Sequence, residues 1–273
     1  MSKIEILQRK AQELRITIIN MIHKAGSGHS GGSLSSSEIL TVLYEDVMNI
    51  RPNEPLWEDR DRFVLSKGHG APALYAILAQ KGFFNSDNLN TLRQLDSCLQ
   101  GHPCMFKLPG IEMSTGSLGM GISVGVGMAL AAQLHKRNNR VFVLCGDGEL
   151  QEGQNWEAMI SAAKWKLDNL VIIIDRNHVQ LDGTEEQVMP MGDLNAKLKS
   201  FIPNLFTCDG HDVKALLDTF QRALNSKGPS VIVAETVKGK GVSFMEGQSA
   251  WHGKTISKEE YILAIKELEE GLK

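Results

Sequence analysis

The sequence has few cysteines, few aromatic residues and no large excess of charge of either sign. Its four cysteines (Cys98, Cys104, Cys145 and Cys208) include no CxxC pair, so neither a disulfide framework nor a cysteine-based zinc site is predicted. The formal net charge of −3 argues against a protein that binds nucleic acid or a membrane surface. We therefore expect a protein of a reducing compartment, the cytoplasm.

Long hydrophobic runs, internal repeats and linkers are also absent. The longest apolar region, residues 121–134, is too short to span a bilayer. The N-terminal stretch MSKIEILQRKAQELR is charged throughout, unlike a signal peptide. With 42% hydrophobic and 22% charged residues, the chain should form a folded protein with a sizeable core. We expect one domain over residues 1–273, with a final helix at about 257–272.

Two short apolar runs, residues 141–145 and 170–174, flank a segment with helical periodicity. This pattern is typical of a β-α-β unit with parallel strands. Similar strand–loop–helix patterns at residues 62–81 and 204–224 extend it, so we predict a doubly wound α/β fold with a mainly parallel sheet and helices on both faces. No GxGxxG sequence follows the first strand, which argues against a nicotinamide-binding domain.

Polar residues follow both apolar runs. The first run ends in a Gly-Asp-Gly sequence at residues 146–148, and Asn177 follows the second. Functional groups gather beyond the carboxyl ends of parallel strands, so Asp147 and Asn177 should lie side by side. Their oxygens suit Mg²⁺, which completes its coordination with water and phosphates. A simple turn would explain Gly-Asp-Gly alone, but the paired Asn177 favours a metal–diphosphate site.

Several loops combine glycine with histidine or lysine. His29, His69 and His102 each lie in such a loop. One loop histidine is more often exposed than catalytic, but three in similar contexts exceed what chance usually gives. Lys67 beside His69, and Lys238 among glycines, suit an anionic ligand such as phosphate, although polar, solvated turns would explain them equally well.

Six motifs in this order resemble the N-terminal, diphosphate-binding part of transketolases. They are SGHSGG, SKGHGAPALYA, GHP, TGSLGMGIS, GDGELQEG with the later Asn177, and ETVKGKG with WHGK. The match extends over about residues 18–254. The resemblance implies a thiamine diphosphate-binding fold and transfer of a two-carbon glycolaldehyde unit from a ketose phosphate to an aldose phosphate, as in the pentose phosphate pathway. It also implies Mg²⁺ as the metal, with Ca²⁺ or Mn²⁺ as substitutes.

The resemblance further implies roles for individual residues. The metal would be held by Asp147, Asn177 and the backbone carbonyl of Val179. Contacts with the cofactor would come from His69, Gly116, Ser117, Leu118, Gly148, Asn177, Leu181, Lys238 and His252. His29, His102 and His252 would bind sugar hydroxyls and assist proton transfer. Glu152 would be a buried or semi-buried acid that links paired active sites across a dimer.

Full-length transketolases continue with a second domain, which supplies the glutamate that activates the cofactor, and with a third domain. Neither follows Lys273, and the chain ends in a capped helix. The resemblance thus implies a natural subunit, completed by a C-terminal transketolase subunit with the pyrimidine-binding domain, most simply as a two-plus-two heterotetramer that acts on sugar phosphates.

Alternatives within the same class are a transketolase for an unusual sugar, a deoxyxylulose phosphate synthase, or a subunit of a 2-oxo acid dehydrogenase. The histidines at positions 29, 69, 102 and 252, together with WHGK, favour transketolase. A non-catalytic subunit that binds the cofactor is the alternative from another class. The intact Asp147, Asn177 and Glu152 argue against it.

Overall fold

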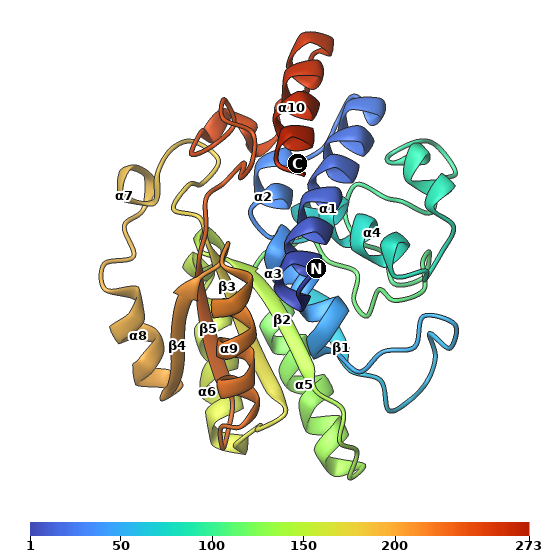
Figure 1. Cartoon of the computed structure of the whole chain (residues 1–273). Helices are drawn as coiled ribbons and strands as arrows, with labels where there is room; N and C mark the ends of the chain where they lie inside the picture. Colours follow the sequence, from blue (N-terminus) through green and yellow to red (C-terminus); the bar gives the residue numbers. More distant parts are fainter. Residues whose placement is uncertain (273) are drawn as a thin grey trace.

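A computed structural model describes residues 1–272 of the chain and contains one five-stranded sheet. The strands are β1 (Arg62–Leu65), β2 (Val141–Gly146), β3 (Leu170–Arg176), β4 (Asn204–Asp209) and β5 (Ser230–Glu235). Their order is β1-β2-β3-β5-β4, and all neighbours run parallel (Figure 1). The predicted parallel sheet is therefore confirmed.

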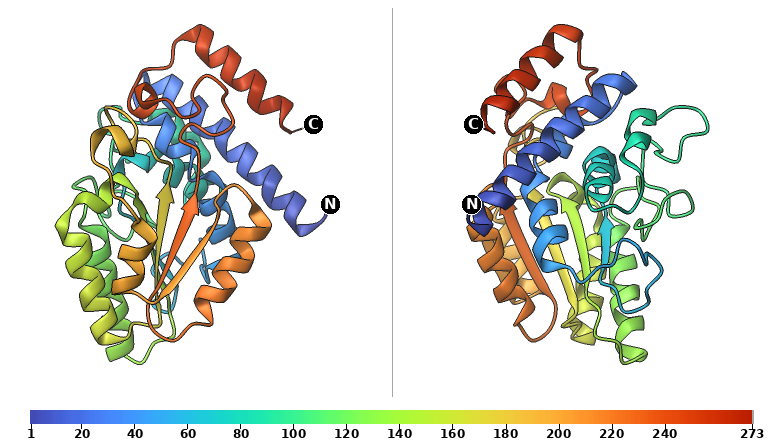
Figure 2. Two further views of the ribbon diagram at one scale, coloured as in Figure 1. Left: turned by 90° about the vertical axis from the view of Figure 1, so that its left-hand side faces the viewer. Right: turned by 45° about the vertical axis from the view of Figure 1, so that its right-hand side comes forward.

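Helices cover both faces of this sheet, as predicted for a doubly wound fold (Figure 2). They are α1 (Lys3–Ala25), α2 (Ser30–Leu34), α3 (Ser37–Val42), α4 (Ala71–Gln80), α5 (Gly121–Leu134), α6 (Gly153–Trp165), α7 (Glu185–Val188), α8 (Leu194–Phe201), α9 (Val213–Leu224) and α10 (Lys258–Glu270). Within residues 1–272, no helix has the length and hydropathy needed to cross a membrane.

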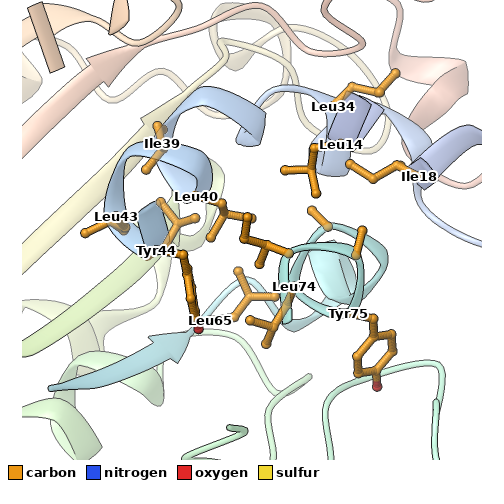
Figure 3. Close-up of a cluster of buried hydrophobic side chains, with 14 of the residues drawn as sticks. Leu14, Ile18, Leu34, Ile39, Leu40, Leu43, Tyr44, Leu65, Leu74 and Tyr75 are labelled. Carbon is orange, nitrogen blue, oxygen red and sulfur yellow. The ribbon is translucent and has the colours of Figure 1, made fainter. Parts of the chain in front are cut away.

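Alternate residues of the strands build two cores, because successive strand side chains point to opposite faces. Val141 and Val143 of β2 pack with α5, α6 and α8. Phe142 and Leu144 pack with α1, α3, α4 and α9 on the other face. Figure 3 shows part of this second core, where Leu14 of α1, Leu40 of α3 and Leu74 of α4 approach one another above β1.

The glycine-rich segment 30–34 lies next to the chain that follows β5. Residues 30–34, although rich in glycine and serine, form α2 and are buried. Gly31 allows this close packing, since a Cβ atom there would lie 2.9 Å from the Trp251 carbonyl oxygen and from Cγ of Lys238. The short helix thereby supports the segments that follow β5.

Candidate functional site

A cavity of about 310 Å³ opens at the carboxyl ends of β1, β2, β3 and β5. The predicted site residues that line it are His69, Leu118, Asp147, Gly148, Glu152, Asn177, Val179, Leu181, Lys238 and His252. Gly116, Ser117, His29 and His102 are not among its lining residues. The ten lining residues come from segments far apart in the sequence, and these segments meet at the carboxyl ends of the strands.

Asp147 and Asn177 lie on adjacent strand ends, since Gly146 of β2 pairs with Asp175 of β3. The Asp147 carboxylate accepts hydrogen bonds from the Gly148 amide at 2.8 Å and the His178 amide at 2.6 Å. His178 reaches it from a left-handed backbone conformation with φ of 61°, which is strained for a non-glycine residue. The side-chain oxygen of Asn177 accepts a bond from the Val179 amide at 3.2 Å.

These oxygens keep free lone pairs and could hold a hard cation. Burial, followed by the charge of Asp175, raises the pKa of Asp147 to about 6, and a cation beside it would offset both effects. Within residues 1–272, no three His, Cys, Asp or Glu side chains form a metal-binding group. A cation at this edge would therefore need further oxygen ligands from water or a bound molecule.

Lys238 lies directly beside the predicted metal ligands. Its ammonium donates to the carbonyl oxygens of Val179 at 2.9 Å and Gln180 at 3.1 Å, and lies 3.1 Å from Nδ1 of His252. The side chain is only 3% exposed. Burial, with the positive charge of Lys67, lowers the pKa of Lys238 to about 8. The Val179 carbonyl that should bind the metal is thus in contact with an ammonium group.

Asp175 anchors a buried polar network that the sequence did not predict. Its carboxylate accepts bonds from the Lys67 ammonium, the Thr236 hydroxyl and the Ser35 hydroxyl, and the Asn177 amide nitrogen lies 3.4 Å away. Burial alone would raise its pKa, but these donors, above all Lys67, hold the pKa of Asp175 below its usual range. Lys67 is therefore engaged in an ion pair, and the network orients Asn177.

Glu149 is a second buried acid at this edge that the sequence did not predict. Its buried carboxylate accepts bonds from the Ser66 hydroxyl at 2.5 Å, the Gly119 amide at 2.9 Å and the Gly146 amide at 3.1 Å. Burial raises the pKa of Glu149 in spite of these bonds. The residue joins the end of β1, the end of β2 and the loop before α5. Its position three residues after the end of a buried strand is the signal that would have identified it.

The loop histidines lie close together. The ring of His29 lies 5.6 Å from that of His69, 6.2 Å from His102 and 5.3 Å from His252, measured between ring centroids. Burial and nearby positive charges lower the pKa of His29 and of His252 to about 4. The pKa values of His69 and His102 are also lowered, mainly by burial. The neutral rings can each donate one hydrogen bond and accept another.

Glu152 is expected to be buried or semi-buried between paired subunits, and for a single chain that burial stays a prediction. It is exposed at the mouth of the cavity in this single chain. Leu118 and Leu181 at the same mouth are 38% and 60% exposed. These three residues are exposed because they lie in loops at the cavity mouth that no other segment of residues 1–272 covers.

Comparison with known proteins identifies the family. The family model described as "Transketolase, thiamine diphosphate binding domain" matches residues 6–270. The chain belongs to this transketolase family. The predicted resemblance, the α/β fold and the thiamine diphosphate-binding domain are thus confirmed.

Relatives of two lengths match this transketolase domain. The chain is 41% identical to an apulose-4-phosphate transketolase subunit of Phocaeicola vulgatus over 271 residues, covering 99% of this chain and 96% of that protein. It is 43% identical to 6-deoxy-6-sulfo-D-fructose transketolase subunit SqwG of a Clostridium species over 264 residues, covering 96% of each. Human transketolase is 39% identical over 257 residues, which cover 94% of this chain but 41% of that protein.

A solved structure supports the same relationship. Transketolase from Campylobacter jejuni superimposes with a TM-score of 0.93 at 34% sequence identity. The match covers 99% of this chain and 43% of that one. This chain therefore has the fold of the N-terminal part of a full-length transketolase.

Proposed function

We propose that the chain is the diphosphate-binding subunit of a two-chain transketolase and forms a single domain over residues 1–273. In this reaction a two-carbon ketol unit passes from a ketose phosphate to an aldose phosphate. The observation that carries the proposal is the open cavity mouth, where Leu118, Leu181 and Glu152 are exposed. A C-terminal transketolase subunit with the pyrimidine-binding domain would cover this mouth, most simply in a two-plus-two heterotetramer.

The donor set at the sheet edge fits a metal–diphosphate. Asp147, Asn177 and the Val179 carbonyl would hold Mg²⁺, or Ca²⁺ or Mn²⁺ in its place, because all three offer oxygen. Gly148, His69, Lys238 and His252 would contact the diphosphate. Gly116, Ser117 and Leu118 would lie along the aminopyrimidine, and Leu181 against the thiazolium. The polar and glycine-rich linings of the cavity support this arrangement.

Bound thiamine diphosphate supplies the carbanion chemistry that breaks and forms the carbon–carbon bond. The chain's own contribution would be to orient the sugar and to move protons. His29, His102 and His252 have neutral rings near pH 7. Each neutral ring offers one N–H to a sugar oxygen and one nitrogen as an acceptor. The Nδ1 acceptor of His252 already faces the Lys238 ammonium, and that of His29 lies 3.5 Å from the Arg93 guanidinium. Glu152 would lie against the neighbouring subunit.

The sugar substrates would be decided largely outside this chain. Two relatives carry names that specify apulose-4-phosphate and 6-deoxy-6-sulfo-D-fructose, so this chain is compatible with an unusual ketose as well as with a pentose phosphate pathway sugar. Groups that bind the sugar phosphate would come from the partner. We also propose a cytoplasmic location, which the four free cysteines support.

The test is an assay of ketol transfer with thiamine diphosphate and Mg²⁺. The chain is assayed alone, the pyrimidine-domain chain alone, and then both together with a ketose phosphate and an aldose phosphate. We expect turnover only in the mixture. Full turnover by this chain alone would refute the two-chain proposal, and a mixture that binds cofactor but acts only on 2-oxo acids would indicate another thiamine enzyme.

A further inference from the structure

Acceptor atoms of the protein surround the ammonium of Lys238, as they would surround a bound metal ion. Its ammonium has three neighbours, the carbonyl oxygens of Val179 and Gln180 and the Nδ1 atom of His252. Within the described residues it forms no salt bridge, in contrast to Lys67, which pairs with Asp175. A buried ammonium without a carboxylate partner usually needs an anion to be stable.

One of these oxygens is also a proposed metal ligand. The Val179 carbonyl oxygen would have to coordinate Mg²⁺, which binds its ligands at about 2.1 Å. Because the ammonium already lies 2.9 Å from this oxygen, a divalent cation there would be only a few ångströms from a second positive charge. Two like charges at such a separation repel each other strongly in a buried site, where water screens them little.

We propose that Lys238 acts as an internal counter-cation: its ammonium binds the Val179 carbonyl in place of the metal, and it leaves this oxygen only when a diphosphate binds together with the metal. The proposal rests on the metal site assigned above. The diphosphate gives the displaced ammonium an anionic partner, since Lys238 already lines the same cavity. Its stem is held against Gly31 of α2, so the head group moves while the stem stays in place.

The exchange has a consequence for selectivity. A metal ion that binds alone must displace the Lys238 ammonium from the Val179 carbonyl without supplying an anion to pair with it, and it therefore binds weakly. A metal–diphosphate offers both the cation for the oxygens and the anion for Lys238. Binding of metal and diphosphate is thus coupled through Lys238. A ligand with one phosphate or none offsets less of the free-energy cost of displacing the ammonium.

The experiment uses Mn²⁺ as the metal and inorganic pyrophosphate as the diphosphate, with the full chain. Electron paramagnetic resonance of free Mn²⁺ gives the dissociation constant with and without pyrophosphate. Lys238→Met removes the charge and retains the length of the stem. We expect this variant to bind Mn²⁺ alone about tenfold more tightly, but Mn²⁺–pyrophosphate less tightly, than the natural chain. Lys238→Gln is a second variant, measured in the same way, and circular dichroism checks that both variants fold.

Lys240→Met is the matched control, because Lys240 lies two residues away and pairs with Glu246 at the surface; neither constant should change. Unchanged Mn²⁺ affinity in both Lys238 variants, with Mn²⁺–pyrophosphate binding still lost in Asp147→Ala, would overturn the role of Lys238 and leave the metal site standing. Full Mn²⁺–pyrophosphate binding by Asp147→Ala would instead refute the metal site itself.

Discussion

Replacing Glu149 tests whether the buried carboxylate fastens the loop before α5 to the sheet edge. Glu149→Ala leaves three donors without their acceptor: the Ser66 hydroxyl and the amides of Gly119 and Gly146. Each buried, unpaired donor costs about 1–3 kcal/mol. Because Glu149 also lines the cavity, water can reach part of the vacated space. We therefore expect the lower end of the sum, a loss of about 3 kcal/mol in the free energy of unfolding.

Glu149→Gln separates hydrogen bonding from charge. The glutamine oxygen can still accept hydrogen bonds from the Ser66 hydroxyl and the Gly119 amide. Its amino group faces the Gly146 amide, and because both of these groups are donors, about one hydrogen bond is lost. The expected loss is about 1 kcal/mol, since the variant also no longer buries a charge. Glu152→Ala is the control, because this exposed residue a short way along the same loop should change stability by less than about 0.5 kcal/mol.

Urea unfolding followed by circular dichroism measures all three variants. The expected order of destabilisation is Glu149→Ala, then Glu149→Gln, then Glu152→Ala. Equal and small losses in both Glu149 variants would refute the reasoning, because water would then replace the carboxylate without penalty.

The packing and the charges support three further predictions. His29 should stay neutral in an NMR titration down to about pH 4, and a measured pKa near 6.5 would contradict this. Between about pH 4 and 6.5 the folded chain then binds fewer protons at His29 than the unfolded chain does. The contribution of His29 to the free energy of unfolding therefore falls as the pH drops through that range. Gly125→Ala should lower the free energy of unfolding by about 1–3 kcal/mol, because its Cβ atom would lie 2.4 Å from Cγ2 of Val143. Gly127→Ala, with open space on the same helix, should raise it by about 0.5–1 kcal/mol; similar effects of both changes would mean that α5 packs differently. His102→Ala, assayed in the reconstituted enzyme, should raise the KM for the ketose donor by about tenfold with the cofactor dissociation constant unchanged, and the reverse pattern would show that His102 contacts the cofactor.

The sheet and the place of the site were accessible from the sequence because both follow from short-range patterns. Apolar runs such as 141–145 specify buried strands, and the order of strand and helix specifies parallel pairing. Parallel pairing then brings Asp147 and Asn177 to one edge without knowledge of the rest of the fold. The final helix expected at about 257–272 has a local signal too, since Ser257 and Glu260 form the capping box at the start of α10.

The features that the sequence did not predict depend on contacts between distant segments. Residues 30–34 become helical because they are buried against Lys238 and Trp251, more than 200 positions away. The partner of Asp175 is Lys67, from another strand end, and no local pattern connects the two. Glu152 could not be placed from the sequence either, because its burial depends on what covers the cavity mouth.

The central claim is that the ends of β2 and β3 hold the metal–diphosphate part of a thiamine diphosphate site. Its most direct test is calorimetric titration of thiamine diphosphate, with and without Mg²⁺, into the complex of this chain with its partner. We predict that binding requires Mg²⁺ in the natural complex and is lost in Asp147→Ala, while the circular dichroism spectrum of the variant is unchanged. Tight, Mg²⁺-dependent binding by Asp147→Ala would contradict the claim.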